Sequence, residues 1–157
     1  MEAKMGAAVI AYWPGITEQQ IESQPGFTID RAWGNWMAVR EEEPAVHEAI
    51  AALGAEAVLT FKTDGWDDDD VNWVSPKQLR EAANKLRDAV LARSPETQVI
   101  LDTYDRARRP SSRRSKPDTY AYPPVAEDFI LELDDIIKIT RWAEEEGATR
   151  ITLEVNW

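Results

Sequence analysis

Residues 125–157 read VAEDFILELDDIIKITRWAEEEGATRITLEVNW and contain the patterns of both kinds of regular structure. From Val125 to Glu146 the apolar side chains recur at helical spacing, and the pattern stops at Gly147, a residue type that commonly terminates helices. From Ile151 to Trp157 apolar and polar residues alternate, which is typical of a strand with one buried face. This stretch therefore predicts a long helix that leads into a strand.

The same two patterns predict the other elements of the chain. Capping-box sequences begin at Thr17 and Ser75, and Pro44 occupies a favourable first helical position. Helices are therefore expected at 18–23, 44–53 and 76–93. Strands are expected at 7–13, 27–31, 35–40, 57–63 and 98–101. Strands interspersed with helices favour an α/β or α+β fold, with a single mixed sheet of five to six strands packed by three to four helices.

The size of the chain bounds its organisation. At 157 residues it is near the usual size of one domain, so residues 1–157 are expected to form a single globular domain. Residues 106–124, rich in arginine, serine and proline, are predicted to form a long basic surface loop. No cysteine is present, and no apolar run is long enough to cross a bilayer. We therefore expect a cytoplasmic protein that does not associate with membranes.

The charge of the chain is unevenly distributed. The formal net charge is −11, yet the segment Arg106–Lys116 carries six basic residues and no acidic one, so the remainder carries −17. An acidic body repels the phosphates of nucleic acids and favours basic proteins and divalent cations. A surface charge that serves only solubility is the simpler alternative.

Four consecutive aspartates follow the predicted strand 57–63, with a tryptophan on either side. Large aromatic side chains dominate the energetically important positions of protein interfaces, and carboxylates attract basic surfaces. The segment is therefore predicted to bind a basic protein partner through Trp66, Asp67, Asp68, Asp69, Asp70 and Trp73.

The same aspartates support an alternative interpretation as a metal site. Hard cations such as Ca²⁺ and Mg²⁺ prefer several oxygen ligands, although this run lacks the spacing of an EF-hand loop. Asp102 and Asp105 would join the site if the predicted strands 57–63 and 98–101 were neighbours. In this interpretation the chain is a metal-binding protein or a metal-dependent hydrolase whose ligands are Asp64, Asp67, Asp68, Asp69 and Asp70.

The basic segment suggests a third function. Clustered arginines suit phosphate groups, and tyrosines near the segment resemble stacking platforms for bases. The acidic body opposes this nucleic-acid contact, and a solvated loop or a loop folded onto the acidic surface are the alternatives. The residues concerned are Arg106, Arg108, Arg109, Arg113, Arg114 and Lys116.

Motifs of familiar enzyme classes are absent from the sequence. It contains no G-x-S-x-G, no GxxxxGK[ST] and no G-x-G-x-x-G. His47 is the only histidine, so a multi-histidine zinc site is excluded, and its place in a helical pattern predicts a partly exposed side chain. No catalytic residue is predicted, and no cofactor apart from the divalent cation of the alternative interpretation.

Two parts of the chain resemble a known family. The stretch 73–86 (WVSPKQLREAANKL), together with Tyr122-Pro-Pro, the sequence Glu144-Glu-Glu-Gly147 and the final strand, resembles the YfbM-like family of small bacterial proteins. The resemblance covers about half of the chain and implies no catalytic residues. In size and charge the chain is also similar to bacterial immunity proteins. The leading hypothesis is therefore a non-enzymatic, protein-binding protein of immunity or regulatory type.

Overall fold

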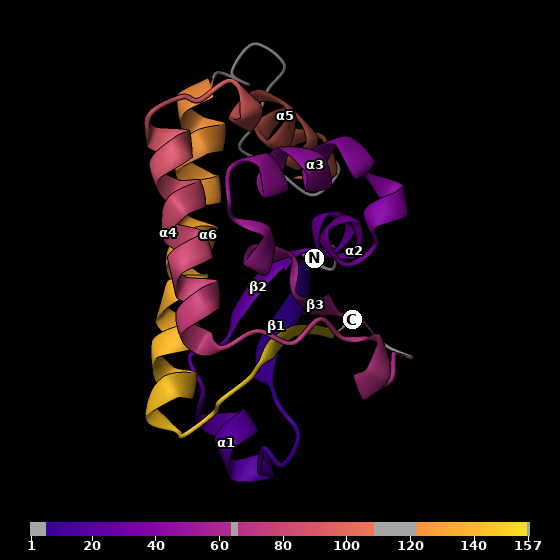
Figure 1. Cartoon of the computed structure of the whole chain (residues 1–157), viewed down its shortest axis with the longest axis vertical. Helices are drawn as coiled ribbons and strands as arrows, with labels where there is room; N and C mark the ends of the chain where they lie inside the picture. Colours follow the sequence, from indigo (N-terminus) through magenta and orange to yellow (C-terminus); the bar gives the residue numbers. More distant parts are fainter. Residues whose placement is uncertain (1–5, 64–65, 109–121, 157) are drawn as a thin grey trace.

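The computed structural model describes residues 6–63, 66–108 and 122–156 (Figure 1). Within these ranges the chain forms six α-helices and one four-stranded sheet, so the mixed α/β class is confirmed. The expected five to six strands and three to four helices are both wrong. The strands are β1 (Gly6–Tyr12), β2 (Phe27–Asp30), β3 (Phe61–Lys62) and β4 (Thr152–Asn156). The helices are α1 (Glu18–Ser23), α2 (Arg31–Ala38), α3 (Pro44–Ala52), α4 (Pro76–Leu91), α5 (Glu96–Arg108) and α6 (Tyr122–Glu145).

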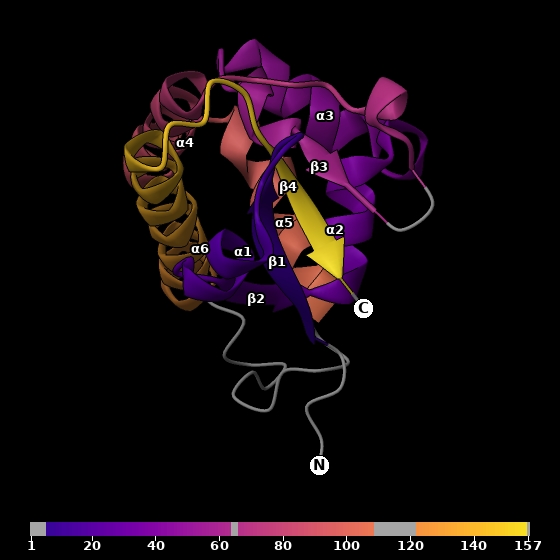
Figure 2. The ribbon, with the colours of Figure 1, turned by 90° about the horizontal axis from the view of Figure 1, so that it is seen from below.

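The sheet is built around a pair of strands that are distant in sequence. Its order is β2-β1-β4-β3, and β1 pairs antiparallel with β4, so that Tyr12 lies opposite Thr152 (Figure 2). β2 is antiparallel to β1, whereas the two-residue β3 is parallel to β4. The central pair therefore joins the first strand of the chain to its last described strand.

The sheet has one apolar, buried face. Val9 and Ala11 of β1 and Leu153 and Val155 of β4 are fully buried, and α5 and α2 lie behind these strands in Figure 2. The alternate residues Ile10, Tyr12 and Glu154 are only half-buried. The alternation predicted for β4 holds at Leu153, Glu154 and Val155 and extends to β1, whereas Thr152 is buried although it lies on the other face.

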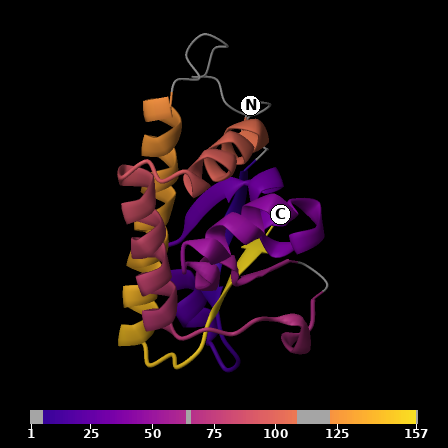
Figure 3. The ribbon, with the colours of Figure 1, turned by 45° about the horizontal axis from the view of Figure 1, so that its top comes forward.

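Helices α4 and α6 form an antiparallel pair beside the sheet (Figures 1 and 3). The predicted cap of α4 is present, because Ser75 Oγ accepts a hydrogen bond from the Gln78 amide at 3.0 Å. Two ion pairs join the helices along their length, at 3.1 Å between Arg80 and Glu144 and at 3.0 Å between Arg87 and Asp134. The apolar face predicted for α6 is buried, including Phe129, Leu133, Ile136 and Ile137.

The predicted strand 98–101 is wrong, because these residues belong to α5. Its β-branched residues favour a strand locally. The buried positions of α5 include Thr97, Ile100, Leu101, Tyr104 and Ala107, which recur at helical rather than at alternating spacing. Burial of one helical stripe against α2, α3 and α6 therefore outweighs the local preference.

The predicted strand 35–40 is also wrong, because α2 occupies most of it. Asp30 Oδ1 accepts a hydrogen bond from the Ala32 amide at 3.1 Å and begins the helix. Gly34 falls between the predicted strands 27–31 and 35–40, where glycine is typical of a turn, but it lies inside the helix where α2 packs on the sheet. A Cβ atom there would lie 2.8 Å from Ile29 Cδ1 and 3.4 Å from Val155 Cγ1, so the absence of a side chain allows this close approach.

Two further boundaries differ from the prediction. Of the predicted strand 57–63 only β3 is extended, and the 3₁₀ turn η2 (Glu56–Leu59) precedes it. The ends of the predicted loop 106–124 are helical, because α5 continues to Arg108 and α6 begins at Tyr122, and residues 109–121 lie outside the described residues. No helix in the described ranges is long and apolar enough to cross a bilayer.

Candidate protein-binding site

The four aspartates lie on a closed turn between β3 and α4. Asp68–Asp70 form the 3₁₀ turn η3. The Asp67 amide donates a hydrogen bond to Asp70 Oδ2 at 3.0 Å, and the Asp70 amide donates to the Asp67 carbonyl at 2.9 Å. All four side chains are exposed, and no ion pair within the described residues involves any of them. The turn therefore presents to solvent four carboxylates that no described residue pairs with in an ion pair.

Trp73 attaches this turn to the body of the protein. Its indole Nε1 donates a hydrogen bond to the Asp68 carbonyl at 3.2 Å. The Arg150 guanidinium lies 4.9 Å from the centroid of the Trp73 ring, and the Tyr12 ring lies 6.1 Å away. One residue further on, Val74 forms a β-bridge with Ile151, just before β4. Trp73 is therefore a half-buried anchor, with part of its surface available to solvent.

A pair of buried threonines fixes the chain after the turn. The Thr60 hydroxyl donates to the Asn72 carbonyl at 2.6 Å, and the Thr152 hydroxyl donates to the Thr60 carbonyl at 3.1 Å. Both threonines are buried, and the bond between them is shielded from competing water. The acidic turn is thus held in one position relative to the sheet.

Tyr12 connects the acidic turn to the half-buried face of the sheet. Its hydroxyl donates to Asp68 Oδ1 over a long 3.5 Å, and its ring lies 5.6 Å from Lys62 Nζ. Lys62 in turn pairs with Glu154 at 3.3 Å. Burial, followed by the negative charge of Asp68, raises the pKa of the Tyr12 phenol above its ordinary value, and Lys62 opposes that rise.

We expect the Tyr12 pKa to fall when Asp68 is changed to asparagine, because a nearby negative charge then no longer disfavours the phenolate. The raised pKa means that the folded protein holds this proton more tightly than the unfolded chain. Its contribution to stability is therefore lost as the pH rises through the tyrosine range near 10. Titration of ¹³C-labelled tyrosine by NMR, with the Tyr12 signal assigned from Tyr12→Phe, measures the change.

The matched control for this titration is Asp69→Asn. It removes the same charge from the next position of the turn, where the side chain does not contact Tyr12 in the described structure. An equal fall of the Tyr12 pKa in both variants would show that the general acidity of the turn, and not the position of Asp68, sets the shift.

The residues of the alternative metal site are described only in part. Asp64 lies outside the described residues. Asp102 and Asp105 belong to α5, where Asp102 accepts a hydrogen bond from Gln98 at 3.0 Å and Asp105 is buried. The condition for Asp102 and Asp105 to join the site, two neighbouring strands, is not met, because the predicted strand 98–101 is part of α5. In the part of the chain that the structure describes, no three acidic or histidine side chains form a group suited to a metal ion.

The basic residues are only partly described. Arg106 lies in α5, pairs with Glu43 at 3.6 Å and stacks 5.6 Å from the centroid of the Trp36 ring, so its charge is engaged within the chain. Arg108 is the last residue of α5. Arg109, Arg113, Arg114 and Lys116 lie outside the described residues.

Other contributors to the site were not predicted from the sequence. Strand alternation could have placed Tyr12 and Glu154 on one face of the sheet. The register of the strands is needed to show that Lys62 lies beside them.

The expected exposure of His47 is wrong. It is buried in α3, and its Nε2 donates to the Trp36 carbonyl at 2.8 Å, which joins α3 to α2.

Comparisons with protein-family models, with curated proteins and with solved structures found no match for this chain. The resemblance to the YfbM-like family therefore stays a prediction. The function has to be inferred from the chemistry of the site.

Proposed function

We propose that the protein is a non-enzymatic binding protein, of immunity or regulatory type, and that its acidic turn Trp66–Trp73 contacts a basic partner protein. The observation that supports this proposal most directly is the exposure of the carboxylates of Asp67 to Asp70. All four are exposed, and within the described residues none of them is neutralised by an ion pair.

The geometry of the turn suits recognition. Its backbone is closed by its own hydrogen bonds, and Trp73, Thr60 and Thr152 fix it to the sheet. A preorganised segment loses little conformational freedom on binding, so more of the interaction energy appears as affinity. Trp66 and Trp73, both half-buried, flank the charges and offer apolar surface beside them. The charges accelerate encounter with a basic surface, and the aromatic rings favour retention of the partner.

Partner capture with charge-matched variants tests this proposal. In one variant Asp67, Asp68, Asp69 and Asp70 are changed to asparagine. The control variant changes four exposed acids elsewhere to glutamine, namely Glu41, Glu42, Glu81 and Glu145. Both variants have the same net charge. A partner retained by the wild type and by the control variant is identified, purified and used for measurement of association kinetics.

We expect the aspartate variant to bind that partner at least about tenfold more weakly, chiefly because association slows. Its affinity should also depend less steeply on salt. The control variant should retain most of the wild-type affinity. Equal losses of affinity in both variants would show that binding depends on the net charge and not on the turn. An unchanged affinity in the aspartate variant would exclude the turn as the contact.

A further inference from the structure

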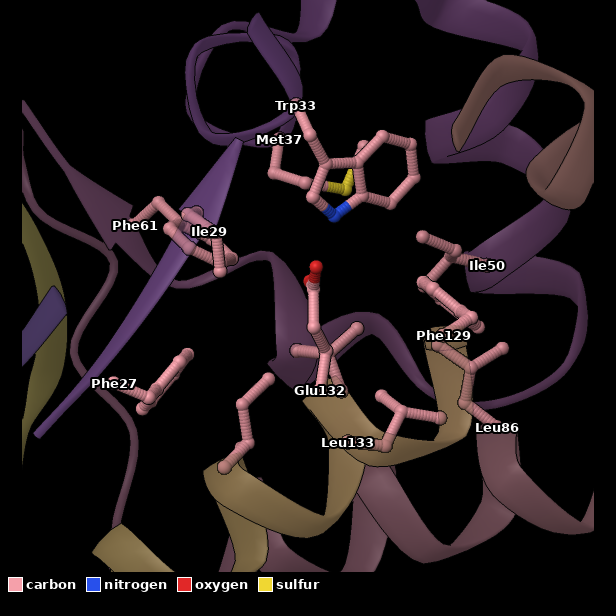
Figure 4. A pocket seen from close by; sticks show the side chains of 12 residues that line it. Phe27, Ile29, Trp33, Met37, Ile50, Phe61, Leu86, Phe129, Glu132 and Leu133 are labelled. Carbon is pink, nitrogen blue, oxygen red and sulfur yellow. The ribbon is translucent and has the colours of Figure 1, made fainter. Parts of the chain in front are cut away.

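The cavity in the core is too small for a ligand larger than water. It lies between the sheet and helices α2, α4 and α6, and Trp33 and Glu132 are among the residues that line it (Figure 4). Its volume is about 20 Å³, which is room for one water-sized group. A much larger groove, with a volume of about 380 Å³, lies at the surface between α4 and α6.

This surface groove is basic, although the chain as a whole is acidic. Arg87 of α4 and Lys138 and Arg141 of α6 line it, and Asp134, paired with Arg87 at 3.0 Å, is the one acid in the lining. Lys138 and Arg141 are exposed, and no ion pair within the described residues involves either of them. Lys138 acts electrostatically on Asp135 of the same helix without forming such a pair. Both cations therefore remain accessible to an anionic partner.

Exposed leucines extend the groove at one end. Leu91 of α4 and Leu131 of α6 are 58% and 60% exposed, and they are the large apolar side chains that the described structure leaves exposed. Leu91 follows Arg87 by four residues, so the two share a helix face. Leu131 precedes Asp134 by three residues and shares its face in the same way. Because α4 and α6 are antiparallel, both leucines lie on one side of the Arg87–Asp134 ion pair and the two accessible cations lie on the other (Figures 1 and 3).

The resulting patch has the length of a short helix. From Leu131 to Arg141 the axis of α6 rises by about 15 Å, which is nearly three turns. Two exposed acids, Glu127 and Glu145, lie one turn beyond the two ends. The apolar and basic surface is therefore confined to the middle of the helix pair.

We infer that the groove between α4 and α6 binds a short amphipathic helix of an acidic partner, with apolar residues at one end of that helix and carboxylates at the other. A third helix fits into the groove between two packed helices. Its apolar end covers Leu91 and Leu131, and its carboxylates reach Lys138 and Arg141. A second copy of this chain is a poorer occupant. If the two helix pairs met face to face in parallel, the basic ends would repel each other, and if they met antiparallel, each basic end would face leucines.

This surface is separate from the acidic turn. The two share no residue, and α4 and α6 lie on the opposite side of the molecule from Asp68–Asp70 (Figures 1 and 3). The inference therefore goes beyond the proposed function and can fail without it.

Synthetic peptides test the inference on the full chain. The probe is a fluorescein-labelled, alanine-based helical peptide with two leucines one turn apart near one end and two glutamates one turn apart near the other. It is made in both orders, because the groove does not fix the direction of the bound helix. A matched peptide carries glutamine in place of each glutamate. We expect saturable binding of the glutamate peptide in fluorescence anisotropy, and binding of the glutamine peptide that is about tenfold weaker or less.

A charge variant locates the binding site. Lys138→Gln combined with Arg141→Gln should weaken binding of the glutamate peptide by about tenfold and remove its advantage over the glutamine peptide. The matched control combines Arg40→Gln with Lys85→Gln, which removes one arginine and one lysine that are exposed elsewhere. The control should bind both peptides as the wild type does.

A leucine variant distinguishes a helix from a small anion. Leu91→Ala combined with Leu131→Ala truncates two exposed side chains, leaves the core intact and should weaken binding of both peptides. If inorganic phosphate displaced the peptide and the leucine variant kept full affinity, the groove would be a small-anion site and the inference would be overturned.

Three other results would also overturn it. They are the absence of saturable binding in either order, equal binding of the glutamate and glutamine peptides, and equal losses in the charge variant and its control. A wild-type dimer in sedimentation that the charge variant dissociates would make a second copy the occupant instead. The variant with asparagine at Asp67 to Asp70 should bind the peptide at least as well as the wild type, and a loss of binding there would place the peptide on the acidic turn.

Discussion

Replacement of Trp33 by alanine is expected to lower the free energy of unfolding by about 3–5 kcal/mol. Trp33 is 3% exposed, and its ring packs edge-on against Tyr104 and Phe129 at 5.1 Å and 5.8 Å. It also forms one wall of the cavity that contains Glu132, so its removal would enlarge an existing void. Equilibrium unfolding in urea, followed by circular dichroism, measures the loss.

The control for Trp33→Ala is Trp66→Ala. Trp66 is half-buried on the acidic turn and outside the core. Its replacement is expected to change the free energy of unfolding by about 1 kcal/mol or less. Similar losses in the two variants would contradict the central position of Trp33, whose ring extends from α2 onto α5 and α6.

Replacement of Leu153 by alanine is expected to cost about 2–5 kcal/mol. Leu153 is fully buried in β4, opposite Ala11 of β1 on one side and Phe61 of β3 on the other. Its side chain belongs to the apolar face of the sheet, so its truncation removes contacts from the centre of the core. The same urea denaturation measures this loss.

A matched leucine provides the control for Leu153→Ala. Leu131 of α6 is 60% exposed, and Leu131→Ala is expected to change the free energy of unfolding by about 0.5 kcal/mol or less. A mild effect of Leu153→Ala, close to that of Leu131→Ala, would show that β4 is not the buried central strand.

The elements with long, regular patterns were predictable from the sequence. The capped helix at Ser75, the helix that ends near Gly147 and the alternating final strand depend on local signals that the fold preserves. Helices α2 and α5 were not predictable in the same way. The β-branched residues of α5 favour a strand. Gly34 of α2 is a residue type typical of turns, and its close approach to Ile29 is seen only in the folded structure. In both cases tertiary packing decides the structure.

Some features of the candidate sites could also be predicted from the sequence, whereas others depend on the fold. The exposure of Asp67 to Asp70 follows from their sequence, because consecutive carboxylates are rarely buried. The anchoring of the turn through Thr60 and Thr152 depends on the pairing of β3 with β4, which no local pattern specifies. The hydrogen bond from Tyr104 to Glu132 joins α5 to α6, and residues 98–101 of α5 were predicted to be a strand. Such contacts can be found only after the fold is known.

The pairing of β1 with β4 has a consequence for biosynthesis. Thr152 leaves the ribosome about 140 residues after Tyr12, its partner in the sheet. At the usual rate of translation this interval is roughly 7–28 s. Throughout this interval the apolar run of β1 lacks the strand that pairs with it at the centre of the sheet, so the nascent chain exposes apolar surface to solvent or to a chaperone. Fusion of a β4 peptide ahead of β1 would shorten that interval and provide a direct route to faster co-translational folding.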